Sequence, residues 1–103
     1  MFCVVQTTIA TKKEAKALTQ KLFEKGLIAC AKMSKVESSY VWEHKFCEQK
    51  EYVLNFITTQ KQLKAVQKAL HQAHSYKLPE FIAFKIDDIS TNYGEWVKKS
   101  VKA

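Results

Sequence analysis

The sequence predicts an α+β fold in which four strands and two helices follow in the order β-α-β-β-α-β, with a short helix at the end. Short stretches rich in β-branched and aromatic residues indicate the strands, and longer stretches with apolar residues at three- and four-residue spacing indicate the helices. A chain of 103 residues is long enough to bury one hydrophobic core but not two. We therefore expect a single domain over residues 1–103.

The first unit is a strand followed by a helix. Residues Phe2 to Ile9 are rich in β-branched side chains and bounded by polar ones, which is typical of a mostly buried strand. Thr11 is a candidate helix N-cap, and Glu14 three positions later completes a capping box. Lys25 and Gly26 supply a basic last turn and a glycine C-cap. Between these signals, Ala15, Leu18, Leu22 and Phe23 follow at the spacing of an amphipathic helix.

A long hairpin follows. Its first arm begins with the apolar run Leu27 to Met33 and continues to Trp42, with a kink expected around Ser34-Lys35. The polar residues Glu43-His44-Lys45 predict the tip, and the return arm runs from Phe46 to Thr58.

The length of this hairpin has a structural consequence. Arms of about 15 residues would extend roughly 50 Å, whereas a globule of this size is only about 35 Å across. Part of the hairpin must therefore overhang, and it would expose Tyr40, Trp42, Phe46 and Tyr52. Association of several copies would cover this apolar surface. The alternative is that bulges fold the ribbon back onto its own core.

The second half of the chain repeats the helix-then-strand pattern. Apolar spacing predicts a helix over Gln60 to Ala73, and Pro79 requires a non-helical connection before it. A fourth strand is expected from Phe81 to Ile86, and Thr91 and Asn92 are candidate caps for the last helix. The complete order is that of a ferredoxin-like split βαβ fold, with an antiparallel sheet and both main helices on one face.

Charge alone does not identify a partner. Seventeen lysines against ten acidic residues give a net charge of +7, which first suggests an anionic partner. The chain has no arginine, however, and its lysines are scattered at positions expected on solvated helix faces. We therefore expect neither nucleic acid nor a membrane as a partner.

The cysteines and the start of the sequence bear on localisation. Three cysteines without close spacing predict neither a disulfide framework nor a thiolate zinc site, and free thiols fit a reducing compartment. The first residues lack the basic start of a signal peptide, and no apolar run approaches the ~20 residues of a membrane span. The expected location is the cytoplasm.

Histidines supply the candidate metal ligands. His71 and His74 lie three apart, so they could share one metal ion, or they could simply interact with the helix dipole. His74 and Glu80 bracket a predicted turn, and an imidazole with a carboxylate suits Cu(II) or Zn(II). A third ligand would have to come from elsewhere in the fold or from another subunit. Glu43 and His44 are either an acid–base pair or a solvated turn. No nucleophile–base motif is present, so we expect no enzyme.

Taken together, these stretches resemble the CutA divalent-cation tolerance family. The matching pieces are Thr7-Thr8, Glu14-Ala15, Leu27-Ile28-Ala29-Cys30-Ala31, Ser38-Ser39-Tyr40-Val41-Trp42-Glu43-His44-Lys45, Glu51 with Ile57-Thr58-Thr59, His74-Ser75-Tyr76-Lys77-Leu78-Pro79-Glu80, and Tyr93 with Trp96. They extend in the right order over nearly the whole chain. His44 departs from the family, which usually has glycine there.

The resemblance implies a non-enzymatic homotrimer like the PII signalling proteins, with binding of copper or another divalent metal ion and a role in metal tolerance. It places Tyr40, Trp42, Glu43 and Tyr76 near a cleft between subunits. His74 and Glu80 are the implied metal ligands, and His44 and His71 are possible supplements.

A second hypothesis keeps the trimer but changes the ligand. The chain would then be a PII-like signalling module whose cleft between subunits binds a small anionic metabolite or a partner protein. Lys45, Lys77 and Lys85 would matter more than the histidines in that case.

Overall fold

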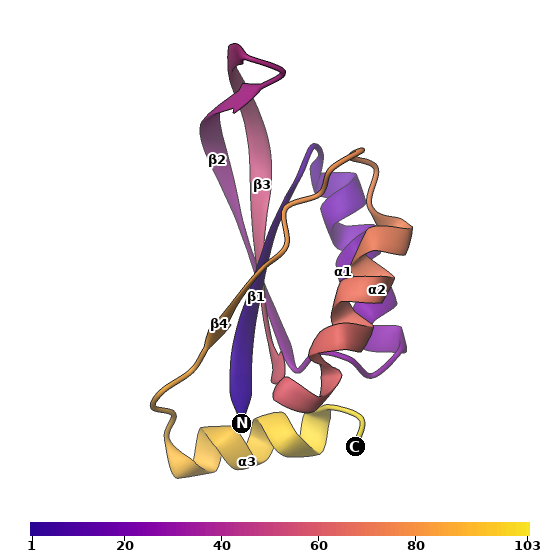
Figure 1. Ribbon diagram of the computed structural model, residues 1–103. Helices are drawn as coiled ribbons and strands as arrows, with labels where there is room; N and C mark the ends of the chain where they lie inside the picture. The colour runs from indigo at the N-terminus through magenta and orange to yellow at the C-terminus, as the bar shows by residue number, and fades with distance from the viewer.

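The structure is a computed structural model that describes residues 1–103. Four strands form one antiparallel sheet in the order β2-β3-β1-β4, and α1 and α2 lie on one side of it (Figure 1). This α+β arrangement has the predicted order of elements. No helix is both long and apolar enough to span a bilayer. The elements are β1 (Phe2–Ile9), α1 (Lys12–Glu24), β2 (Cys30–Trp42), β3 (Lys45–Thr59), the 3-10 turn η1 (Gln60–Gln62), α2 (Leu63–Ala73), β4 (Ile82–Lys85) and α3 (Thr91–Ser100).

The core lies between the sheet and the two main helices. Alternate residues of β1 are buried, and Val5 pairs across the sheet with buried Phe56. Burying a side chain of this size stabilises the fold by about 1.5–3 kcal/mol. The helices and the segment after α1 contribute the remaining large side chains of this core, which include Leu18, Leu22, Leu27, Ile28, Val66 and Leu70.

Local signals in the sequence set the ends of α1. The Thr11 hydroxyl oxygen accepts a 3.1 Å hydrogen bond from the backbone N–H of Glu14, and the hydroxyl donates to the Glu14 carboxylate over 2.8 Å. This confirms the predicted N-cap. Gly26 follows the helix with a φ of +69°, a conformation that glycine adopts without steric cost. The predicted C-cap is therefore confirmed as well.

The hairpin extends well beyond the rest of the sheet, as predicted. β1 reaches only as far as Tyr52, so residues 36–51 form a two-stranded ribbon that overhangs the core (Figure 1). The molecule is accordingly elongated, with extents of 44 × 26 × 21 Å. The kink expected at Ser34-Lys35 is wrong, because β2 and β3 pair residue for residue along their whole length. The same unbroken register rules out bulges that would fold the ribbon back.

Other boundaries also differ from the prediction. β3 begins at Lys45, a residue expected in the turn, and β4 (Ile82–Lys85) is shorter than the strand expected from Phe81 to Ile86. The first arm of the hairpin is a strand only from Cys30, because the preceding apolar residues pack into the core as a connection. The helix expected from Gln60 begins as a 3-10 turn, which commonly tightens a helix end. Ser90, and not Thr91 or Asn92, is the N-cap residue of α3, because its backbone is extended and its carbonyl accepts from Gly94.

The second face of the sheet is largely uncovered. α3 crosses one end of it, where Gly94 lies so close to Phe2 that an added Cβ would approach the ring to 3.3 Å (Figure 1). Away from α3, Ile82 and Phe84 of β4 are 41% and 51% exposed. Tyr40 and Trp42 of the ribbon belong to the same face through their alternation in β2. A single chain thus leaves a broad apolar surface open to solvent.

Candidate functional site

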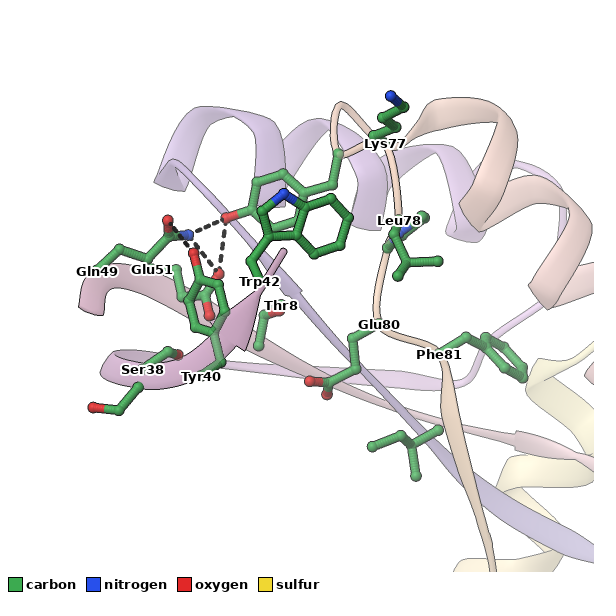
Figure 2. A pocket seen from close by; sticks show the side chains of 14 residues that line it. Thr8, Ser38, Tyr40, Trp42, Gln49, Glu51, Lys77, Leu78, Glu80 and Phe81 are labelled. Atoms are coloured by element: carbon green, nitrogen blue, oxygen red, sulfur yellow. Dashed lines mark hydrogen bonds between the residues drawn. The ribbon is translucent and has the colours of Figure 1, made fainter. Parts of the chain in front are cut away.

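A cavity lies between the ribbon and the connection from α2 to β4. Its volume is about 780 Å³, and we call it the ribbon pocket (Figure 2). The ribbon lines it with Tyr40, Trp42, Gln49 and Glu51, and the connection lines it with Tyr76, Lys77, Leu78, Pro79 and Glu80.

A hydrogen-bond network joins the two walls of the ribbon pocket. The Tyr76 hydroxyl donates to Oε1 of Glu51 over 2.8 Å. The Gln49 amide donates to the same oxygen over 3.1 Å and to the Tyr76 hydroxyl oxygen over 2.8 Å. Its carbonyl oxygen accepts from the Tyr40 hydroxyl over 2.9 Å (Figure 2). Four side chains from three segments are therefore fixed relative to one another.

Glu51 is the buried centre of this network. Its side chain is only 5% exposed, although it lies on the overhanging ribbon. Burial of the Tyr76 ring raises the pKa of the hydroxyl well above its usual value, and the hydrogen bond to Glu51 and the charge of Glu51 raise it further. Tyr76 is consequently a stable hydrogen-bond donor to this carboxylate at neutral pH.

His74 holds the connection in place. It is the C-cap residue of α2 with extended backbone angles, and its Nδ1 accepts from the backbone N–H of Tyr76 over 3.1 Å. Nε2 must then carry the hydrogen, which it donates to the Thr8 carbonyl oxygen over 2.7 Å. The imidazole also packs against the Tyr76 ring, with centroids 4.9 Å apart. Both ring nitrogens are thus engaged within the chain.

Glu80 forms part of the opposite wall of the ribbon pocket. Its Oε2 accepts a 2.9 Å hydrogen bond from the Gln6 amide on β1, and the side chain is half-buried. The second carboxylate oxygen has no protein partner within hydrogen-bond distance, so Glu80 can still bind a cation.

The other predicted residues lie apart from this wall. His44 is exposed at the far tip of the hairpin, where it and Glu43 both have positive φ values of 68° and 50°. His71 is exposed on α2, and its Nδ1 interacts with the Gln67 carbonyl oxygen. Neither histidine lines the ribbon pocket, and Glu43 does not line it either.

The residues of one chain do not complete a metal site. No three side chains among histidine, cysteine, aspartate and glutamate are close enough to hold one ion. His74 would have to give up a hydrogen bond before it could bind a metal, because each of its nitrogens has a backbone partner. The assignment of His74 and Glu80 as ligands therefore stays a prediction that needs further ligands from outside the chain.

Sequence reasoning missed Gln49 and the central place of Glu51. Both lie in a polar part of the return arm that looks like an ordinary solvated strand. The signal was present in the register, because a two-residue turn at Glu43-His44 places Gln49 opposite Ser38 and Glu51 opposite Val36. Period-two alternation from Tyr40 and Trp42 then brings all of these side chains to one face.

Comparisons with known proteins identify the family and the fold. The family model described as CutA1 divalent ion tolerance protein matches residues 3–100. The divalent-cation tolerance protein CutA of Thermotoga maritima is 31% identical, with 95% of this chain and 97% of the relative covered. The structure of CutA from Synechococcus elongatus PCC7942 is 33% identical, with a TM-score of 0.94 over 98% of this chain and 90% of that one.

A further solved structure shows how closely the fold is shared. The periplasmic divalent cation tolerance protein CutA of Archaeoglobus fulgidus is 24% identical and superimposes with a TM-score of 0.96, over 99% of this chain and 100% of that chain. At this identity the likeness supports the fold alone. The family match over nearly all of the sequence and the relatives above 30% identity together show that this chain belongs to the CutA1 divalent ion tolerance family.

Proposed function

We propose that this chain serves divalent-cation tolerance as a non-enzymatic homotrimer of ferredoxin-like, PII-like subunits that binds a divalent cation of the Cu(II) type. The observation that carries the proposal is the uncovered apolar face that continues onto the ribbon, with Phe84 and Trp42 among its exposed side chains. Apolar surfaces of this extent mark association sites in soluble proteins. The name of the family denotes tolerance of divalent ions and no reaction.

Assembly would supply the additional metal ligands that a single chain lacks. The half-buried Glu80 retains a free carboxylate oxygen in the wall of the ribbon pocket, but one chain offers no third ligand. A neighbouring subunit that packs on the open face would bring its own side chains to this wall. Glu80 is then the first ligand, and His74 joins only by releasing the Thr8 carbonyl oxygen. His44 and His71 are supplements that only another copy could bring near.

Light scattering coupled to gel filtration tests the assembly. The expected mass is three times the 11.9 kDa of one chain. A monomer at micromolar concentration would overturn the homotrimer.

Titration calorimetry with Cu(II) and with Zn(II) tests the cation site. Glu80→Gln keeps the size and the hydrogen bond to Gln6 but removes the charge, so the affinity should fall by about tenfold or more. His74→Ala should weaken Cu(II) binding if the imidazole joins the site. Glu48→Gln removes a carboxylate charge at an exposed position, so it is the matched control and should leave the affinity within about twofold. Unchanged affinity in both Glu80→Gln and His74→Ala would overturn metal binding at this site.

We also propose a cytoplasmic location. Support comes from the three free cysteines, of which Cys30 and Cys47 are only half-buried and suit a reducing compartment. Cell fractionation of the native host with an antibody against this chain is the direct test, and recovery outside the cytoplasm would overturn the assignment.

A further inference from the structure

Glu51 is a buried carboxylate without a counter-charge. Its two hydrogen bonds come from Tyr76 and Gln49, which are both neutral donors. The only lysine that lines the ribbon pocket is Lys77, and its ammonium group points away from the carboxylates (Figure 2). Buried charges in proteins are normally paired, because removing a carboxylate from water is unfavourable. A side chain that is 95% buried and lines a pocket therefore indicates a cation from outside the chain.

The walls of the ribbon pocket indicate the kind of cation. Three aromatic residues, Tyr40, Trp42 and Tyr76, line the cavity that Glu51 also lines. Figure 2 shows the rings of Tyr40 and Trp42. The face of such a ring attracts an organic cation, and recognition of ammonium groups by aromatic cages is a common use of this attraction. Glu80 adds a second carboxylate on the opposite wall. Aromatic rings do not act as ligands for divalent metal ions.

Size and charge favour an organic cation as the molecule that fills the ribbon pocket. A volume of about 780 Å³ falls in the range of small-molecule sites and greatly exceeds that of a bare ion. An anionic metabolite would meet two carboxylates and would find no lysine turned toward it. Lys45 and Lys85, which the anionic hypothesis requires, do not line the cavity.

We propose that the ribbon pocket binds a small organic cation, specifically an ammonium compound. Glu51 is its counter-charge, Glu80 is a second carboxylate contact, and the rings of Tyr40 and Trp42 pack against its alkyl groups. This inference goes beyond the proposed metal function and does not depend on it. A lysine from a second copy of the chain offers the same chemistry, so the experiment must separate that source from a free ligand.

The test uses the fluorescence of Trp42 in the otherwise intact chain. Trp96→Phe removes the only other tryptophan, and EDTA in all solutions excludes metal ions, so failure of the metal proposal cannot affect the result. Choline chloride is the probe, and 3,3-dimethyl-1-butanol is its neutral isostere with carbon in place of nitrogen. We expect saturable binding of choline that is at least about tenfold tighter than binding of the alcohol. Equal affinities would overturn the proposal.

Charge-neutralising variants assign the site. Glu51→Gln keeps the shape and the acceptor for Tyr76, and it should weaken choline binding by about tenfold or more. Glu48→Gln makes the same change at an exposed position of the ribbon and should alter affinity less than about twofold. Circular dichroism checks folding, and Glu80→Gln serves as the second variant, with a smaller loss expected. Unchanged choline affinity in the folded Glu51 or Glu80 variant would overturn the assignment.

A lysine from a second copy of the chain would give a different result from a free ligand. If choline fails to bind the Trp96→Phe chain while Glu51→Gln converts the assembly into smaller species on light scattering, a lysine of another copy neutralises Glu51. That outcome would overturn the free-ligand site.

Discussion

Tyr76 donates a 2.8 Å hydrogen bond to Glu51, a residue 25 positions earlier in the sequence. This bond ties the connection after α2 to a ribbon that has no helix behind it (Figure 1). It therefore sets the separation of the two walls of the ribbon pocket. His74 supports the bond from the side of α2, because it fixes the backbone N–H of Tyr76.

Removing the Tyr76 hydroxyl should destabilise the fold. Tyr76→Phe leaves the buried Glu51 carboxylate with one donor fewer, so we expect a loss of about 1–3 kcal/mol in the free energy of unfolding. Tyr40→Phe removes a hydroxyl from a more exposed residue and should cost about 0.5 kcal/mol or less. Urea unfolding measures both. Equal losses in the two variants would contradict a special place for the Tyr76–Glu51 bond.

The same hydroxyl should make stability depend on alkaline pH. The pKa of Tyr76 is raised in the folded chain above its usual value of 10.0, chiefly by burial and then by Glu51. As the pH rises past that usual value, the unfolded state loses the proton first, so the folded state loses stability. The contribution of Tyr76 is thus complete below about pH 10 and disappears as the pH rises toward the folded pKa.

Comparison with Tyr76→Phe isolates this effect, because lysines and other tyrosines titrate in both proteins. The difference in the free energy of unfolding between the wild type and Tyr76→Phe should narrow between about pH 8 and about pH 11. Urea titrations at the two pH values measure it. If this difference in the free energy of unfolding stays constant or widens with pH, the pKa of Tyr76 is not raised by folding.

Glycine at the hairpin tip should stabilise the chain. His44 has a φ of 68°, a left-handed conformation that costs most residues about 1–2 kcal/mol. His44→Gly removes this cost but gives the unfolded chain more freedom, so a net gain of about 0.5–1 kcal/mol is expected. Lys45→Gly, in the adjacent strand position, should instead lose stability. Urea midpoints at one fixed protein concentration compare the two, and a loss in both variants would contradict strain at His44.

Charge placed on the open face should weaken assembly. Phe84→Asp puts a carboxylate on the uncovered side of the sheet, so the proposed homotrimer should dissociate into smaller species. Phe23→Asp makes the same change at a residue of similar exposure on α1, on the side that the helices cover. Light scattering should show a lower mass for Phe84→Asp only. A lower mass for Phe23→Asp alone would place the interface on the helical side.

Local patterns predicted the elements well because each depends on neighbouring residues. The N-cap at Thr11 and the glycine after α1 act within one helical turn, and both are in the structure. The overhang followed from arm length alone. Boundaries that tertiary packing decides were harder, as at Ser90, which caps α3 through its backbone and not its side chain.

The site was harder to predict from the sequence because its hydrogen bonds join residues that lie far apart in the chain. The Gln49 and Glu51 positions depend on the register across an entire hairpin, which a single residue in the turn would change. His74 has the chemistry of a metal ligand, but only the fold shows that Thr8 and Tyr76 occupy its nitrogens. The amino-acid sequence alone does not show that both ring nitrogens of a histidine are already hydrogen-bonded.

The ribbon is at once a wall of the pocket and part of the uncovered face. Only the base of the ribbon is paired with β1. Contacts within the pocket and contacts on the uncovered face therefore both influence the position of the ribbon. A ligand that fixes the ribbon from within the pocket would favour the same ribbon geometry that a neighbouring copy requires. By thermodynamic reciprocity, assembly would then tighten ligand binding by the same factor by which the ligand strengthens assembly. With a proposed ligand and a proposed neighbouring copy both in contact with it, the overhang would couple ligand binding to association.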